Sequence, residues 1–165
     1  MNSPVSAPAQ SPRAVVESLE REFALIDART RELLQQIPDE MLYRSAVLPG
    51  LYTSVGELIL RSARAVEQTC GGLNANLWDD PFEWTLPETL STPALVKEYL
   101  DEVKQTRNEC FARLKGDEEL KKFIALPGDA TQPLIQLLLE TLLRAAGNLE
   151  RAAVILAAKN EGDSW

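Results

Sequence analysis

Four stretches of the chain carry apolar residues at alternating intervals of three and four, which places them along one face of an amphipathic helix. The second stretch begins at Val55, and the others cover residues 13–37, 93–115 and 134–159. No segment combines strict apolar–polar alternation with β-branched residues, so strands are not expected. The pattern predicts an all-α protein, an up-down four-helix bundle with a long loop between the second and third helices.

The starts of the predicted helices carry capping signals. Ser11-Pro12 and Thr92-Pro93 each place a hydroxyl before a proline at the first helical position. Ser54 and Glu57 have the spacing of a capping box, in which each side chain bonds the backbone of the other residue. The second helix reaches Gly71-Gly72, where it either ends or bends.

The last helix, expected to open at Thr131-Gln132-Pro133, is apolar around most of its circumference. A helix of this kind must bury more than one face. It is therefore either the central helix of the bundle or part of a subunit interface, and we expect a homodimer through it. Its polar residues form one narrow stripe: Gln136, Glu140, Arg144, Asn148 and Arg151.

The remaining segments define a single domain over residues 13–160. Residues 1–12 hold three prolines among small polar residues and predict a disordered tail, and residues 161–165 predict a flexible C-terminus. The loop between the second and third helices carries Trp78, Phe82 and Trp84. These aromatic side chains form either the rim of a ligand cleft or a plug that covers one end of the core.

Charge and composition narrow the range of partners. The 165 residues carry a net charge of −8, which argues against nucleic acid and anionic membranes as partners. No window supplies the roughly 20 apolar residues of a membrane span. The only two cysteines, Cys70 and Cys110, form no metal or redox motif and indicate buried free thiols in a reducing compartment, so a cytoplasmic location is expected.

The chain contains no histidine. This absence excludes a Ser-His-Asp triad, a Cys-His dyad, histidine-ligated zinc and an imidazole base. It removes the commonest groups that hydrolases and metalloenzymes use near neutral pH.

Several segments resemble motifs of the DinB-like (YfiT-like) superfamily of four-helix bundles. Residues 54–61 (SVGELILR) resemble its second-helix motif, and residues 140–148 (ETLLRAAGN) resemble the pattern H-x-x-x-H-R-G-Q of its last helix. Residues 80–84 (DPFEW) and 90–95 (LSTPAL) resemble the loop and the start of its third helix. The resemblance extends over roughly residues 13–158.

In that family one histidine of the second helix and two of the last helix bind a divalent metal near one end of the bundle. The matching positions here are Arg61, Thr141 and Ala145, none of which is a usual metal ligand. The resemblance therefore implies the fold of the family without its metal site, and no cofactor is expected.

A fixed positive charge at a vacated metal position suggests a polar pocket for a small anionic ligand. A buried guanidinium requires carboxylate partners or a bound anion. The alternative is that Arg61 and Arg144 lie on solvated faces and pair with Glu57 and Glu140 at helical spacing. The side chains expected to line such a pocket are Glu57, Arg61, Trp84, Glu140, Arg144 and Asn148.

Paired carboxylates offer a second chemistry. Glu17-x-x-Glu20 and Glu98-x-x-Asp101 have the spacing with which all-α nucleotide pyrophosphatases hold magnesium, although the same spacing is common on solvated helix surfaces. The sequence favours a non-catalytic or small-ligand-binding protein. The alternatives are a metal-dependent hydrolase or transferase of the DinB-like type with carboxylate ligands, or a magnesium-dependent nucleotide hydrolase.

Overall fold

The structure is a computed structural model that describes residues 11–48 and 51–161. The tail expected over residues 1–12 lies outside the described residues as far as residue 10. The C-terminus expected over residues 161–165 lies outside them after residue 161.

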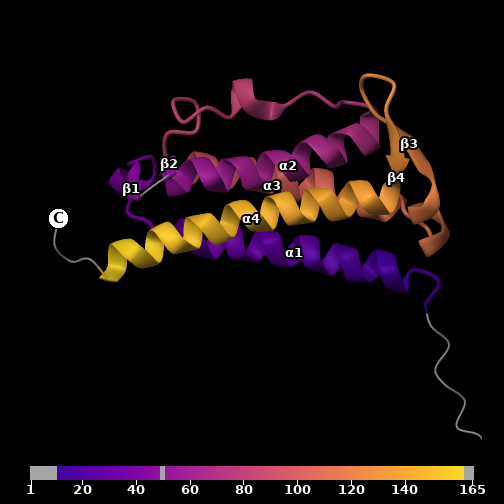
Figure 1. Cartoon of the computed structure of the whole chain (residues 1–165), viewed down its shortest axis with the longest axis horizontal. Helices are drawn as coiled ribbons and strands as arrows, with labels where there is room; N and C mark the ends of the chain where they lie inside the picture. The colour runs from indigo at the N-terminus through magenta and orange to yellow at the C-terminus, as the bar shows by residue number, and fades with distance from the viewer. Residues whose placement is uncertain (1–10, 49–50, 162–165) are drawn as a thin grey trace, which may run out of the picture.

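In the described residues the chain forms four α-helices: α1 (Ala14–Gln35), α2 (Val55–Ala75), α3 (Pro93–Arg113) and α4 (Leu134–Glu161). They pack as the bundle in Figure 1, so the predicted helical class is confirmed. The Ser54–Glu57 capping box and the Thr92 cap form as predicted. α2 continues through Gly71-Gly72 and ends at Ala75, and the C-cap residue that follows, Asn76, has a left-handed φ of 57°.

The order of helix directions differs from the prediction. α2 and α3 run parallel: Tyr99 donates to Glu67, and seven residues further along both helices Asn74 donates to the carbonyl of Thr106. Residues 76–92 therefore cross the length of the bundle (Figure 1). The up-down alternation holds between α1 and α2 and between α3 and α4, and it fails between α2 and α3.

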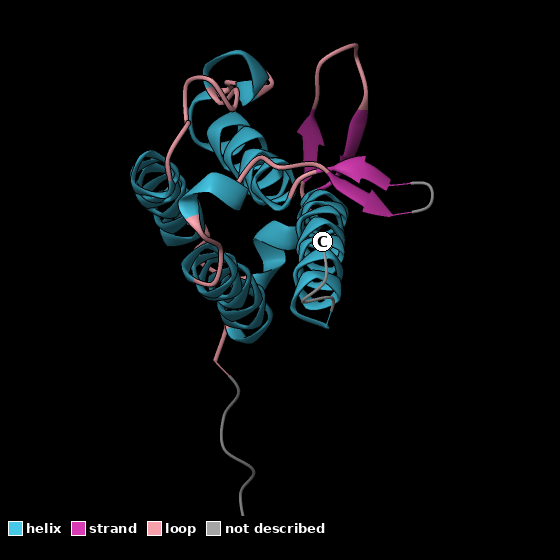
Figure 2. Cartoon of the chain, turned by 90° about the vertical axis from the view of Figure 1, so that its left-hand side faces the viewer, coloured by secondary structure: helices cyan, strands magenta, loops and turns pink. Residues whose placement is uncertain are grey.

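The described residues also form two short antiparallel hairpins, which the sequence did not predict. β1 (Ala46–Leu48) pairs with β2 (Leu51–Thr53), and β3 (Phe123–Ala125) pairs with β4 (Thr131–Pro133). They lie outside the four helices, at opposite ends of the bundle (Figures 1 and 2). Strands of three residues are too short to display an alternating pattern. Residues 131–133 thus form β4 instead of opening α4, which begins at Leu134.

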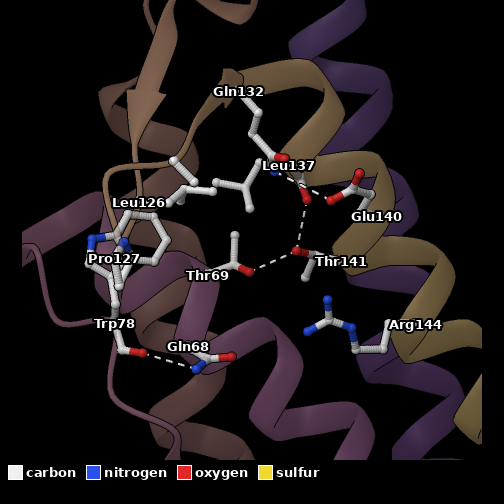
Figure 3. Close-up of a pocket in the computed structure, with 11 residues that line it drawn as sticks. Gln68, Thr69, Trp78, Leu126, Pro127, Gln132, Leu137, Glu140, Thr141 and Arg144 are labelled. Carbon is white, nitrogen blue, oxygen red and sulfur yellow. Dashed lines mark hydrogen bonds between the residues drawn. The ribbon is translucent and has the colours of Figure 1, made fainter.

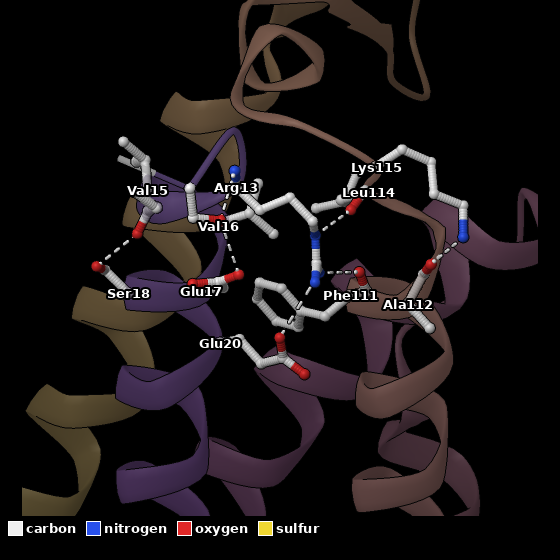
Figure 4. A network of polar contacts seen from close by, with 12 residues as sticks. Arg13, Val15, Val16, Glu17, Ser18, Glu20, Phe111, Ala112, Leu114 and Lys115 are labelled. Atoms are coloured by element: carbon white, nitrogen blue, oxygen red, sulfur yellow. Dashed lines mark hydrogen bonds and ion pairs between the residues drawn. The ribbon is translucent and has the colours of Figure 1, made fainter. Parts of the chain in front are cut away.

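The start of α1 is held by the segment that follows α3. The backbone amides of Val15 and Val16 donate to the carboxylate of Asp117 in the 3-10 helix η3 (Asp117–Lys121), at 3.0–3.1 Å. Arg13, not Ser11, is the N-cap residue of α1, and the Ser11 hydroxyl accepts a hydrogen bond from the Arg13 amide at 3.2 Å. Figure 4 shows Arg13 reaching from α1 to the carbonyls of Phe111 and Leu114. This end of the bundle is closed by tertiary contacts.

The other 3-10 helices are η1 (Asp39–Met41) and η2 (Pro81–Trp84). The bundle core includes Phe23 and Phe111, whose ring centroids lie 5.3 Å apart, and buried leucines from α2 and α4. Within the described ranges, none of the helices has the length and apolar character needed to cross a membrane.

Candidate functional site

A cavity of about 310 Å³ lies between the second half of α2, the first half of α4 and the turn of the β3–β4 hairpin. Its volume is at the lower end of the range typical of small-molecule sites, about 300–1,000 Å³. Figure 3 shows polar side chains from α2 and α4 facing apolar residues of the loop and the hairpin.

The floor of the cavity is a pair of buried threonines. Thr69 of α2 and Thr141 of α4 are 5% and 2% exposed, and their Oγ1 atoms lie 2.7 Å apart. Thr141 also donates to the carbonyl of Leu137, one turn earlier, at 2.8 Å. Thr141 is one of the three positions that the sequence resemblance matched to metal ligands, and in the structure it is paired with a hydroxyl from α2.

Two opposite charges on α4 border the opening. Glu140 accepts hydrogen bonds from Gln132 at 3.3 Å and Gln136 at 2.8 Å. The guanidinium of Arg144 points toward the space beside Thr141 (Figure 3) and, among the described residues, makes neither a hydrogen bond nor an ion pair. Both charged side chains are exposed to solvent.

The apolar wall includes Trp78, which packs against the helix backbone at Gly72. A Cβ at position 72 would lie 2.2 Å from Trp78 Cε3, so only glycine allows this approach. Gln68 Nε2 donates to the Trp78 carbonyl at 2.9 Å, and Trp78 Nε1 donates to Asn76 at 2.9 Å. The indole is therefore held in place at the cavity, next to Leu126, Pro127 and Leu137.

The cavity contains two of the six side chains that we predicted to line a pocket, Glu140 and Arg144. Arg61 is exposed and does not line it, which agrees with the alternative in which this arginine lies on a solvated face. The α2 side chain that faces Ala145 is instead Ser62, whose hydroxyl donates to the Ala145 carbonyl at 3.1 Å. Ser62 directly follows Arg61, so the two side chains differ by about 100° in direction around the helix axis.

The other three predicted residues lie elsewhere. Glu57 belongs to the capping box; burial alone would raise its pKa, but hydrogen bonds from Ser54 and Thr53 and the charge of Arg61 lower it. Trp84 lies on η2 and is exposed, and Asn148 is half-buried on α4. Neither lines this cavity.

Sequence reasoning missed three polar lining residues, Gln68, Thr69 and Gln132. Thr69 carried a usable signal, because it is a polar residue on the inward-facing stripe of its helix. Gln132 carried none, since its position depends on the unpredicted β4 strand.

The paired carboxylates are not brought together. Glu20 pairs with Arg13, which bonds the C-terminal end of α3, whereas Asp101 pairs with Arg31 near the other end of α1. The two acidic pairs therefore lie at different positions along the interface between α1 and α3. Among the described residues, no group of three or more Cys, Asp or Glu side chains is placed to hold a metal ion.

Two other buried clusters lie between α2 and α3. Cys70 and Cys110 are free thiols, and the neighbouring Cys110 thiol, together with burial, raises the pKa of Cys70 well above its ordinary value. Burial also raises the pKa of Glu67, which accepts a hydrogen bond from Tyr99. A protonated, enclosed thiol is a poor nucleophile, so Cys70 acts as a core residue.

Comparisons with protein-family models, with curated proteins and with solved structures found no match to this chain. Its function is therefore inferred from the geometry of the cavity.

Proposed function

We propose that this protein is a non-catalytic, small-ligand-binding helical bundle of the DinB-like type that has lost its metal site. The observation that carries the proposal is Arg144, a guanidinium that borders a cavity and has no partner among the described residues. An arginine side chain matches the planar geometry of carboxylates and phosphates and binds them with charge-assisted hydrogen bonds. The ligand therefore carries a carboxylate or phosphate group.

Contacts between α2 and α4 support the loss of the metal site. Thr141 and Ala145 occupy two of the vacated ligand positions, and they contact Thr69 and Ser62 through neutral hydrogen bonds. Hydroxyl groups that already have hydrogen-bond partners offer little to a divalent cation, whereas they suit the floor of a binding pocket. The enzymatic alternatives have no comparable observation in their favour.

A homodimer through α4 and a cytoplasmic location belong to the same proposal. Leu139, Leu143 and Val154 are exposed on one stripe of α4, where a second copy of the helix would cover them. The free thiols Cys70 and Cys110 suit a reducing compartment.

The proposal is tested by thermal unfolding in the presence of small ligands. The probes are inorganic phosphate and small carboxylates, with and without an amino group. A ligand that binds only the folded state raises the midpoint of unfolding as its concentration increases. We expect at least one carboxylate to do so, and we expect Arg144→Gln to abolish the shift.

Arg151→Gln is the matched control, because Arg151 is an exposed arginine two turns further along α4 that does not line the cavity. It should leave the ligand-induced shift unchanged. If none of the probes moves the midpoint of the wild-type protein, the ligand-binding proposal is wrong.

A further inference from the structure

The two charges at the cavity do not neutralise each other. Glu140 and Arg144 are four residues apart on α4, a spacing at which opposite charges on a helix commonly pair. In the described part of the chain they form no ion pair, and Glu140 instead accepts hydrogen bonds from Gln132 and Gln136. The cavity therefore presents one free cation and one carboxylate to whatever enters it.

A ligand that satisfies both groups must itself carry both charges. A simple anion at Arg144 would lie close to the Glu140 carboxylate and would also meet the repulsion of a chain with a net charge of −8. A zwitterion has no net charge and avoids this repulsion, while its ammonium group gives Glu140 a partner. The arrangement thus selects against simple anions as well as for a zwitterion.

The rest of the cavity limits the size and polarity of the ligand. A volume of about 310 Å³ holds on the order of ten water molecules at about 30 Å³ each, which is comparable to the number of non-hydrogen atoms in a free amino acid. Opposite the charged pair lie Trp78, Leu126 and Pro127, an apolar surface suited to a hydrocarbon or aromatic side chain.

From these observations, and on the basis of the proposed ligand-binding function, we infer that the ligand is a free α-amino acid with an apolar side chain. Its carboxylate binds Arg144, its ammonium group binds Glu140, and its side chain packs on Trp78. The buried Thr69 and Thr141 close the cavity below it.

The test compares the affinities of three phenyl compounds that differ in which charged groups they carry. Isothermal titration calorimetry measures these affinities. L-phenylalanine carries both charges, 3-phenylpropanoate lacks the ammonium group, and 2-phenylethylamine lacks the carboxylate. L-leucine and L-methionine represent the other apolar side chains. We expect at least one of the three amino acids to bind, and the best of them to bind about tenfold or more tightly than its analogue lacking either charged group.

Variants of Glu140 and Arg144 test which side chain binds each charged group of the ligand. Glu140→Gln should bring the affinity for the amino acid down to that of its deaminated analogue, without weakening the analogue itself. Arg144→Gln should remove binding of both. Glu150→Gln is the matched control, because Glu150 lies on α4 but pairs with Arg29 away from the cavity. Thermal unfolding of each variant without ligand checks that it is folded.

The outcomes separate this inference from the broader proposal. If deaminated carboxylates bind as tightly as the amino acids, the amino-acid inference is wrong while the ligand-binding function stands. Binding of phosphate with no binding of the three amino acids would lead to the same conclusion. If neither the amino acids, the other carboxylates nor phosphate binds, both fail.

Discussion

Thr69 donates its hydroxyl hydrogen to Thr141 across the α2–α4 interface. Their Oγ1 atoms are 2.7 Å apart, and Thr141 Oγ1 is also 2.8 Å from the carbonyl oxygen of Leu137. A hydroxyl has a single hydrogen, and a carbonyl oxygen can only accept. Thr141 therefore uses its hydrogen on Leu137, which leaves Thr69 as the donor between the two threonines.

Because Thr69 is the donor, substitutions of the two threonines should lower the stability by unequal amounts. Thr141→Val should leave the Thr69 hydroxyl buried without its acceptor and lower the free energy of unfolding by about 1–2 kcal/mol. Thr69→Val removes a donor whose partner keeps its bond to Leu137, so the loss should be smaller, about 0.5–1 kcal/mol. Urea unfolding of both variants measures the difference.

The double variant completes the cycle. Because the two side chains interact directly, the loss in the double variant should be smaller than the sum of the two single losses. Equal losses from the two single variants would contradict the assigned direction, and strict additivity would contradict the direct interaction.

Features of this structure that depend on neighbouring residues could be predicted from the sequence, whereas features that depend on contacts between distant residues could not. The four helices follow from apolar spacing, and the caps at Ser54 and Thr92 follow from local residue types. The cap of α1 could not be predicted, because its acceptor, Asp117, is about a hundred residues away in the chain. The parallel direction of α2 and α3 depends on how residues 76–92 cross the bundle, which their composition does not specify.

The residues that line the cavity could also be predicted only where they depend on a local pattern. Glu140 and Arg144 could be singled out from the polar stripe of the last helix, but which neighbours they face depends on a hairpin too short to predict. The inward position expected for Arg61 depends on its match to a family position. In the structure the stripe of α2 that faces α4 passes through Ser62 and Thr69 instead. An error of one residue is about 100° of helical rotation, enough to turn a side chain from the interior to solvent.

Gly72 and Gly147 test the packing of Trp78. Gly72→Ala should destabilise the protein by about 1–3 kcal/mol, because the added methyl group would overlap the indole ring. Gly147 is an exposed glycine in α4, and a Cβ added there would have nothing within 4 Å, so Gly147→Ala should stabilise by about 0.5–1 kcal/mol. Thermal unfolding of the pair, with tryptophan fluorescence to follow Trp78, distinguishes the two effects. A neutral Gly72→Ala would show that the indole does not pack there.

Glu57 should make stability depend on pH in a specific direction. Its pKa in the folded protein is below the ordinary value of 4.5, so the unfolded chain binds more protons in the window between the two values. The stabilisation is complete above about pH 4.5 and is lost as the pH falls through the lowered pKa. Glu57→Gln should cost about 1 kcal/mol at neutral pH, and this difference from the wild type should shrink on acidification.

Glu67 serves as a control, because its contribution to stability should depend on pH in the opposite direction. Burial raises its pKa above 4.5, so the folded protein holds the proton more tightly than the unfolded chain does. Its favourable contribution is present below pH 4.5 and is lost as the pH rises through the raised pKa. The difference between wild type and Glu67→Gln should therefore change in the direction opposite to that for Glu57. Parallel trends in the two variants would indicate a general acid effect.

Removal of divalent cations should leave the fold unchanged. Metal analysis of protein purified without a histidine tag should find no stoichiometric transition metal, and dialysis against a chelator should not shift the unfolding midpoint. A stabilising metal would lower the midpoint when removed, because it binds the folded state. Stoichiometric zinc or magnesium held by Asp and Glu would favour the enzymatic alternatives.

Leu143 tests the proposed dimer. It is 72% exposed at the centre of the apolar stripe of α4, so Leu143→Glu should place a charge in the interface and give a monomeric mass in light scattering at micromolar concentration. Phe123→Glu is the matched control, since Phe123 is 70% exposed but lies on β3 outside that stripe. We expect the wild type and the control to be dimeric. A monomeric wild type would rule out the dimer, and a dimeric Leu143→Glu would move the interface to another face of the bundle.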